Sequence, residues 1–245
     1  MSDQAQPSIR KTVAVWWNGV RARNSLLSSF HQFAAKVWEF VRDSTAERRK
    51  QRYGDADYDW EQRVNTTSAT VGWRDRLLGQ FLSPYQPTEP KLFHKMLGAM
   101  AIDFSRFTFI DIGSGKGRTL LMAADYPFQR VMGVEILPAL HAAAEANIAS
   151  YRAASQKCFK IESRCQDART FEFPPGPILL YLFNPLPEAG LVEMLGTLHR
   201  ALASQPREAY VLYHNPELER VFACPPWRKL RGTHQYSLFT HLSLK

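Results

Sequence analysis

Cysteine is scarce in this chain, with three residues in a length of 245. Cys158, Cys165 and Cys224 are odd in number and form no C-x-x-C pair. A framework of disulfides needs paired cysteines, and structural zinc sites are typically built from C-x-x-C pairs, so neither is expected. We expect no metal site in this protein.

The early chain also lacks an apolar run of membrane-spanning length. The uncharged stretch from Thr12 to Val20 is far shorter than the roughly 20 apolar residues that such a helix needs. Residues 1–11 carry two positive charges, but no apolar segment with a small-residue cleavage site follows, as a secretory signal would require. We therefore expect a cytoplasmic protein without a transmembrane helix, with peripheral membrane attachment as an open alternative.

Acidic residues are fewer than basic ones, 23 against 31, which gives a formal net charge of +8. The excess is uneven, because residues 1–52 contain ten Lys and Arg but only four Asp and Glu. Clustered positive charge attracts polyanions, so this region predicts contact with nucleic acid or with an anionic membrane surface. A solvated helix face explains the same charges, and both interpretations stay open.

The composition, 45% hydrophobic and 22% charged, is that of a globular protein and excludes a wholly disordered chain. Patterning divides the chain into three parts. Residues 1–52 form a basic amphipathic helical region, residues 53–86 a linker or lid, and residues 87–245 the main domain.

Two helices are expected in the first part. Between Ser25 and Arg49 apolar residues recur every three to four positions, and a shorter run from Val13 to Val20 has the same spacing. The two predict a helical hairpin. Its apolar stripe favours packing against the main domain or a second subunit, and adsorption to a membrane interface is the alternative.

The main domain is expected to begin at a helix that Thr88 caps, ahead of Pro90. From there strand and helix patterns alternate, which predicts an α/β fold with a mostly parallel, doubly wound sheet. The expected strands cover residues 107–112, 130–134, 158–162, 178–183, 208–213 and 235–242. The expected helices cover residues 117–124, 138–151, 191–203 and, more briefly, 216–222.

A glycine-rich turn follows the first of these strands directly. The run Asp111-Ile112-Gly113-Ser114-Gly115-Lys116-Gly117-Arg118 lets the backbone turn tightly and approach a ligand, while the amides of the next helix face its anionic end. A dinucleotide fingerprint would need its third glycine at position 118, and a Walker loop would need Gly-Lys-Ser/Thr. NAD and ATP are therefore both disfavoured.

The pattern Asp-x-Gly-x-Gly-x-Gly resembles motif I of the class I, seven-β-strand S-adenosylmethionine-dependent methyltransferases. The resemblance extends from about Pro87 to the end of the chain and implies a seven-stranded Rossmann-like sheet that binds S-adenosyl-L-methionine. It implies that the cofactor loop consists of Asp111, Gly113, Ser114, Gly115 and Gly117.

The same resemblance implies that Glu135, Asp167 and Ala168 also contact the cofactor. Glu135 ends the second strand, where the family places an acid that binds both ribose hydroxyls. Asp167, followed by Ala168, comes after the third strand, where the family places an Asp that contacts the adenine amino group. A carboxylate suits a diol because each of its oxygens can accept one hydroxyl hydrogen bond.

The acceptor side is less well defined. The fourth strand ends in Asn184-Pro185, which resembles the acceptor motif of enzymes that methylate amide or adenine nitrogens, but Leu186 and Pro187 depart from it. Asn184 is a candidate catalytic residue that would orient an acceptor N–H. The alternative is a plain turn that leads into the next helix.

Tyr85-Gln86-Pro87-Thr88 resembles the segment that Dot1-type protein-lysine methyltransferases fold over the methionine end of the cofactor. This likeness implies that Tyr85 lines the transfer site as a second catalytic candidate and that Thr88 binds the cofactor carboxylate. His214 would be a general base if the acceptor were a hydroxyl, and otherwise a structural histidine.

We expect a methyltransferase whose acceptor is a protein side-chain amine, that is, a lysine. The alternatives are a nucleic-acid or small-molecule methyltransferase, or a non-catalytic cofactor-binding scaffold that docks through its basic helices.

Overall fold

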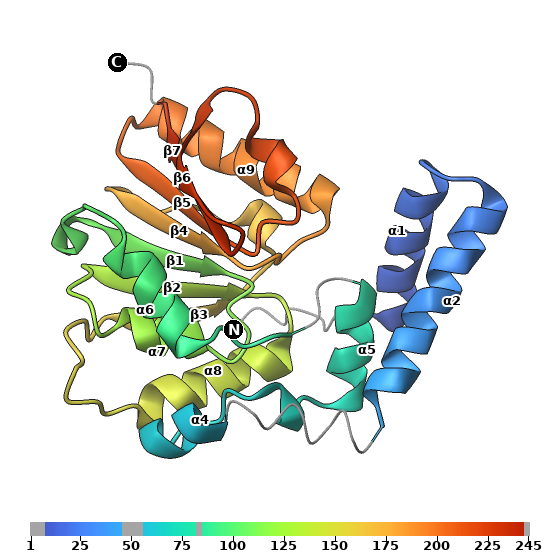
Figure 1. Cartoon of the computed structure of the whole chain (residues 1–245), viewed down its shortest axis with the longest axis horizontal. Coiled ribbons are helices and arrows are strands. Elements are labelled where there is room, and N and C mark those ends of the chain that lie inside the picture. The colour runs from blue at the N-terminus through green and yellow to red at the C-terminus, as the bar shows by residue number, and fades with distance from the viewer. Residues whose placement is uncertain (1–7, 46–55, 82–84, 243–245) are drawn as a thin grey trace.

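A seven-stranded sheet forms the centre of the computed structural model, which describes residues 8–45, 56–81 and 85–242 (Figure 1). The strand order is β3-β2-β1-β4-β5-β7-β6. Strands β1 to β5 are parallel, and β7 runs antiparallel to both β5 and β6. The bounds are β1 Thr108–Ile112, β2 Arg130–Glu135, β3 Ile161–Cys165, β4 Ile178–Leu182, β5 Ala209–His214, β6 Trp227–Gly232 and β7 Tyr236–His241. The expected mostly parallel, seven-stranded sheet is confirmed.

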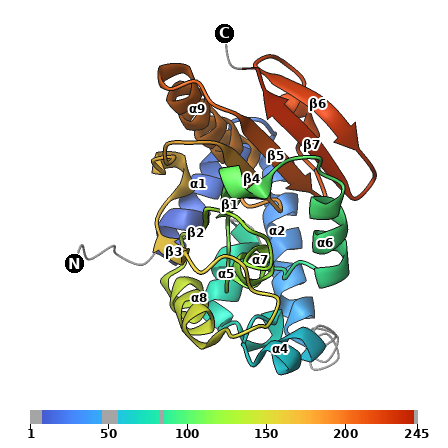
Figure 2. The same cartoon turned by 90° about the vertical axis from the view of Figure 1, so that its left-hand side faces the viewer.

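The sheet is apolar on both faces because helices cover both. All five residues of β1 are buried, and they alternate between two core clusters, Ile110 and Ile112 in one and Phe109 in the other. Helix α9 (Glu188–Ser204) packs on the first cluster, and helices α6 (Pro90–Gly98) and α7 (Arg118–Ala123) pack on the second. Figure 2, which looks along the strands, shows α6 and α9 on opposite sides of the sheet. Helix α8 (Pro138–Ser150) packs along β3.

Helix α6 does not start as the sequence predicts. Its N-cap is Glu89, and Thr88 lies one residue earlier with its side chain buried. The Thr88 hydroxyl hydrogen-bonds the Tyr181 hydroxyl at 2.9 Å instead of capping the helix. The cap prediction is wrong because a tertiary contact with β4 takes the side chain that would otherwise cap the helix.

Two strands differ from expectation. β3 begins at Ile161 instead of residue 158, because the backbone N–H of Cys158 donates to Ala124 O at the end of α7. β6 is absent from the sequence-based prediction. Its sequence, Trp-Arg-Lys-Leu-Arg-Gly, does not alternate, and every residue after Trp227 is exposed. A charged edge strand of this kind blocks further strand pairing without the pattern of a half-buried strand.

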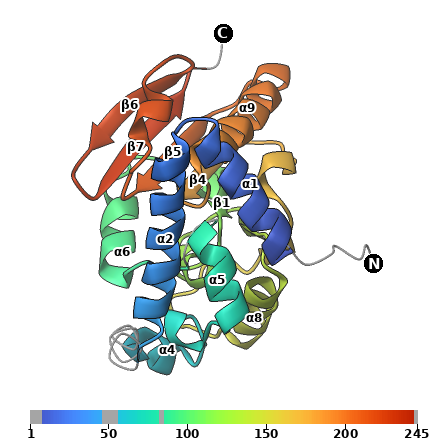
Figure 3. The ribbon, with the colours of Figure 1, turned by 90° about the vertical axis from the view of Figure 1, so that its right-hand side faces the viewer.

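The first part of the chain forms the expected helical hairpin, from α1 (Ile9–Arg21) and α2 (Leu26–Asp43). Helix α5 (Trp73–Phe81) packs against both. The contacts are aromatic, with ring centroids 5.3 Å apart for Trp16 and Phe81 and 5.9 Å apart for Phe33 and Phe81. The second helix is predicted to reach residue 49, but α2 ends at Asp43 with Ser44 as its C-cap, and residues 46–49 lie outside the described residues. Figure 3 shows α1, α2 and α5 in front of the strand ends.

The segment predicted as a linker or lid, residues 53–86, contains helices. Its described residues form α4 (Ala56–Gln62), a 3₁₀ turn η2 (Ser68–Thr70) and α5. Three more 3₁₀ turns follow later, η3 (Phe104–Arg106), η4 (Ala168–Thr170) and η5 (Glu219–Phe222), the last where a short helix is expected. None of the helices in the described residues has the length and apolar character needed to cross a bilayer.

Candidate active site at the strand ends

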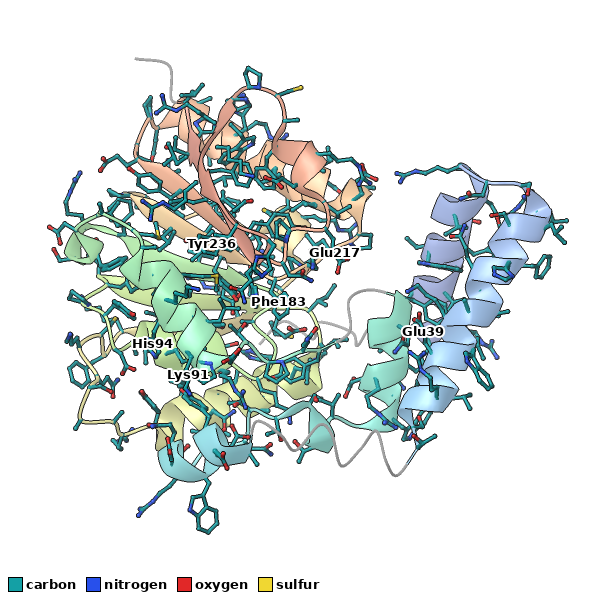
Figure 4. The ribbon with its side chains drawn as sticks, in the orientation of Figure 1. Glu39, Lys91, His94, Phe183, Glu217 and Tyr236 are labelled. Atoms are coloured by element: carbon teal, nitrogen blue, oxygen red, sulfur yellow. The ribbon has the colours of Figure 1, made fainter. Side chains whose placement is uncertain are left out.

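A cavity of about 770 Å³ lies where the carboxyl ends of the parallel strands meet the helical hairpin. Ligands bind at this edge in open α/β sheets, because the loops that follow neighbouring strands diverge there. Figure 4 shows Phe183, which lines the cavity just after β4, at the edge that faces the hairpin. Of the residues predicted for the site, the cavity is lined by Tyr85, Thr88, Asp111, Gly113, Ser114, Glu135, Asp167 and Ala168.

Gly115 and Gly117 are outside this lining but shape the same loop. Gly113, Gly115 and Gly117 all have positive φ, at 76°, 54° and 81°. A Cβ on Gly115 would overlap a ring carbon of Tyr85, and one on Gly113 would lie 2.8 Å from Pro185 Cβ. The loop therefore accepts only glycine at these two positions, for conformation and for space.

Asp111 is a buried acid at the end of β1. Its carboxylate accepts a hydrogen bond from the Thr119 hydroxyl, and it is 3% exposed. Burial raises the pKa of Asp111 to about 8, against the lowering effect of Thr119, and the charge of Glu135 raises it further. A cation placed beside Asp111 would lower its pKa and stabilise the ionised form.

Glu135 fastens the glycine-rich loop to the end of β2. Its Oε2 accepts from the Gly115 N–H and its Oε1 from the Leu137 N–H, both at 2.8 Å. Burial raises the pKa of Glu135, and these backbone hydrogen bonds partly oppose the rise. Each carboxylate oxygen keeps a second lone pair, so the group can still accept a pair of hydroxyls.

The carboxylate of Asp167 forms its hydrogen bonds within its own segment of the chain. It caps η4 by accepting from the Arg169 N–H at 2.9 Å and from Arg169 Nε at 3.0 Å. Burial raises the pKa of Asp167, but the hydrogen bonds and charge of Arg169 outweigh it, so that the pKa is below its ordinary value. The neighbouring Ala168 is buried and lines the cavity.

Asn184 does not line the cavity, although Phe183 and Pro185 on either side of it do. Its Oδ1 accepts from the Tyr213 hydroxyl at 2.7 Å, and its Nδ2 donates to Asn215 O at 2.8 Å. Asn184 has a φ of 45°, a conformation that asparagine tolerates better than most residues. The side chain therefore ties the loop after β4 to the loop after β5.

Tyr85 lies across the glycine-rich loop. Its hydroxyl donates to Thr66 O at 2.5 Å, and its ring occupies the space beside Gly115. Burial raises the pKa of Tyr85 above its ordinary value, so the phenol stays protonated. Tyr85 thus contributes a ring face to the cavity, while its hydroxyl is committed to the backbone.

His214 sits behind the cavity and is not part of its lining. Its Nδ1 hydrogen-bonds the Tyr181 hydroxyl at 2.8 Å, and its ring centroid lies 4.0 Å from that of Phe183. Burial lowers the pKa of His214 to about 4, so it is neutral at pH 7. These contacts support the interpretation of His214 as a structural histidine. They do not support its alternative role as a general base.

One buried polar cluster beside the cavity is absent from the sequence-based prediction. Arg118, which follows the glycine-rich turn, is buried and pairs with Asp59 of α4, with Nη2 and Oδ1 3.3 Å apart. Asp59 also accepts from the Thr66 N–H at 2.6 Å and the Thr67 N–H at 2.8 Å. The ion pair and these hydrogen bonds fix the segment from α4 to η2 against the loop.

Lys116 completes this cluster. Its ammonium group donates to Thr67 O at 2.9 Å and to the Thr70 hydroxyl. Burial lowers the pKa of Lys116 to about 8, although the charge of Asp59 raises it. A sequence signal for this cluster does exist, because the basic residues Lys116 and Arg118 can pair with the acidic, aromatic run at residues 53–60. That run lies more than 50 positions earlier in the chain.

Among the described residues, no group of three His, Cys, Asp or Glu side chains comes together as a metal site. Searches with protein-family models and among curated proteins find no match to this chain.

Solved structures that the chain resembles include three methyltransferases. An RNA methyltransferase from Salinibacter ruber, in complex with S-adenosyl-L-homocysteine, is 20% identical over 64% of this chain and 92% of its own, with a TM-score of 0.43. Magnesium protoporphyrin IX methyltransferase from Synechocystis, with bound S-adenosylmethionine, is 14% identical over 84% of this chain and 95% of its own, with a TM-score of 0.45. A ribosomal protein L11 methylase from Lactobacillus delbrueckii is 15% identical over 64% of this chain and 87% of its own, with a TM-score of 0.41. Values this low transfer neither a cofactor nor an acceptor, and a similarity to Dot1-type enzymes is not shown.

Proposed function

We propose that this chain is an S-adenosylmethionine-dependent methyltransferase. The observation that carries the proposal is the cavity that gathers the glycine-rich loop, Asp111 and Glu135 at the ends of two adjacent strands. Glu135 has lone pairs left for a ribose diol, and Asp111 is a buried acid that a cation would stabilise. A nucleoside that carries a cationic methionine end matches this pair of acids.

The remaining contacts follow from the same lining. Ala168 and Asp167 are proposed to border the adenine, and Thr88 to lie near the methionine end, where Tyr181 holds its hydroxyl. Asp167 is already bonded to Arg169, so its contribution to adenine binding is expected to be smaller than that of Glu135 to the ribose.

When bound, the cofactor supplies a methyl group activated by a sulfonium. The residues of this chain then align the acceptor lone pair with that methyl and exclude water. Phe183 and Tyr85 supply ring faces at the cavity wall, and α1 and α5 cover its far side with Trp16 and Phe81. Asn184 acts in this proposal as a positioning residue, because it fixes the loop that carries Phe183 and Pro185.

A small molecule is the acceptor that the geometry favours. The cavity has the volume typical of small-ligand pockets. Helices α1 and α5 form one wall, with Val15, Trp16 and Phe81 beside Leu186 of the main domain. Such an apolar wall suits an acceptor that enters the cavity whole.

A protein side-chain amine is the second candidate, on one observation. Tyr85 and Phe183 both line the cavity, and aromatic walls lower the pKa of a lysine by removing water from its ammonium group. The lysine acceptor expected from the sequence therefore stays a proposal.

The test is transfer of a radiolabelled methyl group from the cofactor to separated fractions of a cell extract. We expect label in the small-molecule or lipid fraction with the wild-type chain, and a strong loss of label with Glu135→Gln. Glu145→Gln, an exposed glutamate on α8, is the matched control and should behave as wild type. Label in the protein fraction would select the lysine acceptor. Cofactor binding without label in any fraction would support a non-catalytic scaffold.

A further inference from the structure

The outer face of α2 carries large apolar side chains that the described residues leave largely exposed. Leu27 is 84% exposed, Trp38 66% and Phe30 56%. Leu26, Val37 and Val41 on the same helix are also exposed, and all of these positions repeat at helical spacing. The apolar stripe predicted from the sequence therefore packs only in part, and its remainder faces solvent.

The opposite side of α2 is fixed, so this exposure is a property of one face and not of a loose helix. Ser29 is fully buried there, and Phe33 contacts both Trp16 and Phe81. In Figure 1 the hairpin stands clear of the sheet at one end of the molecule, with α2 outermost. The exposed stripe thus lies on an outward, accessible surface.

Basic side chains border this stripe. Trp17 of α1 contacts Phe30, with ring centroids 5.0 Å apart, and Arg10 and Arg21 lie seven residues before and four after Trp17, on the same side of α1. The described residues 8–45 contain six Lys and Arg against two acids. One of those acids, Glu39, is drawn on the α5 side of α2 in Figure 4.

We propose that the outer face of α2 binds the surface of an anionic lipid bilayer. A helix that lies in the membrane interface needs an apolar face with aromatic side chains and a basic border, and this hairpin has both. Helix α1 lines the cavity with Val15 and Trp16, so binding in this way holds the cavity close to the lipid surface. The inference stands independently of the methyltransferase proposal.

Two other occupants fit the surface less well. A second copy of the chain would bring two basic borders together, because a symmetric contact pairs like with like. Nucleic acid binds to dense basic groups with stacking aromatics, whereas exposed Leu27, Val37 and Val41 offer its phosphates nothing.

The experiment is sedimentation of the full chain with vesicles of phosphatidylcholine alone, or with phosphatidylglycerol added, at physiological salt. We expect binding to the anionic vesicles at least about tenfold tighter than to the neutral ones, since neither the apolar face nor the charge binds tightly alone. The double variant Leu27→Glu, Trp38→Glu should lose about tenfold or more of this affinity.

Trp60→Glu is the matched control, because Trp60 is 87% exposed but lies on α4, away from the stripe. Circular dichroism checks that each variant folds. Absence of binding to anionic vesicles by the wild type, or equal loss in the Trp60 variant, would overturn the proposal. A dimer in light scattering that the double variant dissociates would also overturn it, as would RNA binding that depends on Arg10 and Arg21 without vesicle binding.

Discussion

The strand-end site and the hairpin use the same kinds of side chain in opposite ways. At the strand ends the acids Asp111 and Glu135 are buried, and the apolar residues of β1 and β4 are covered by helices of the same chain. On α2 the apolar side chains are exposed, next to basic ones. The strand-end site is covered by residues of this chain, whereas the outer face of α2 has the character of a surface that binds a partner.

An apolar pattern predicts that a surface is buried but does not identify what buries it. Burial of apolar area stabilises a fold wherever the partner is found, so an amphipathic helix predicts a partner without identifying it. For the sheet the partner is α6, α7 or α9. For half of α2 no partner lies within the described residues. Substitutions at the site and at the hairpin test this distinction.

The largest effect is expected beside the strand-end site, at the buried ion pair of Arg118 with Asp59 of α4. Arg118→Ala leaves Asp59 without its partner, and removal of one member of a buried pair typically costs about 3–5 kcal/mol of stability. Urea unfolding measures the change. Arg130→Ala, which removes an exposed pair with Glu162, should change stability by less than about 1 kcal/mol. Equal effects of the two variants would contradict the role given to Arg118.

A pH-dependent effect is expected at Asp111. Because burial raises its pKa to about 8, the folded chain keeps a proton that the unfolded chain loses near pH ~4. Its stabilising contribution is full below that pH and is lost as the pH rises toward 8. Asp111→Asn removes this dependence, so wild type should lose stability relative to the variant between pH 5 and pH 8. Parallel urea unfolding curves for the two chains across this range would contradict the assignment.

Asn184 separates positioning from cofactor binding. Asn184→Gly deletes the hydrogen bonds to Tyr213 and Asn215 but keeps the positive φ, so methyl transfer should slow by about tenfold while cofactor affinity stays within about twofold. Asn184→Ala adds backbone strain and should also lower stability. Initial rates and calorimetry give the two readouts. Unchanged transfer in the Gly variant would assign Asn184 to a simple turn.

The smallest effect is expected at the ion pair that bridges the hairpin to α9. Arg23 and Glu188 lie 3.4 Å apart, and the side chains are 60% and 32% exposed. Arg23→Ala should therefore change stability by no more than about 1 kcal/mol. Trp16→Ala, which removes an aromatic contact with Phe81, is the comparison and should cost more. A larger effect from Arg23 would mean that charge, and not aromatic packing, holds the hairpin.

Local patterns were enough to predict most of the fold. Six strands, the hairpin and the glycine-rich turn follow from periodicity and from glycine spacing, which are properties of neighbouring residues. β6 was missed because an exposed basic edge strand has no alternation to detect. The η2 segment was missed because its anchors, Lys116 and Arg118, lie far away in sequence.

The candidate site shows the same division. The strand pattern together with the family resemblance predicts Asp111, Glu135 and Asp167 at or just after strand ends, and all three line the cavity. The sequence predicts Thr88 as a cap, which is wrong because the actual partner of its side chain, Tyr181, is 93 residues away. The position of Asn184 behind the cavity depends on Tyr213, another long-range contact that no local pattern reveals.

The most direct test of the central claim is calorimetric titration of the purified chain with S-adenosylmethionine and S-adenosylhomocysteine, with NAD as the control. We expect micromolar binding of the first two, weakened by about 1–3 kcal/mol in Glu135→Ala, and no binding of NAD. Binding of NAD, or no binding of either S-adenosyl compound by the folded chain, would contradict it.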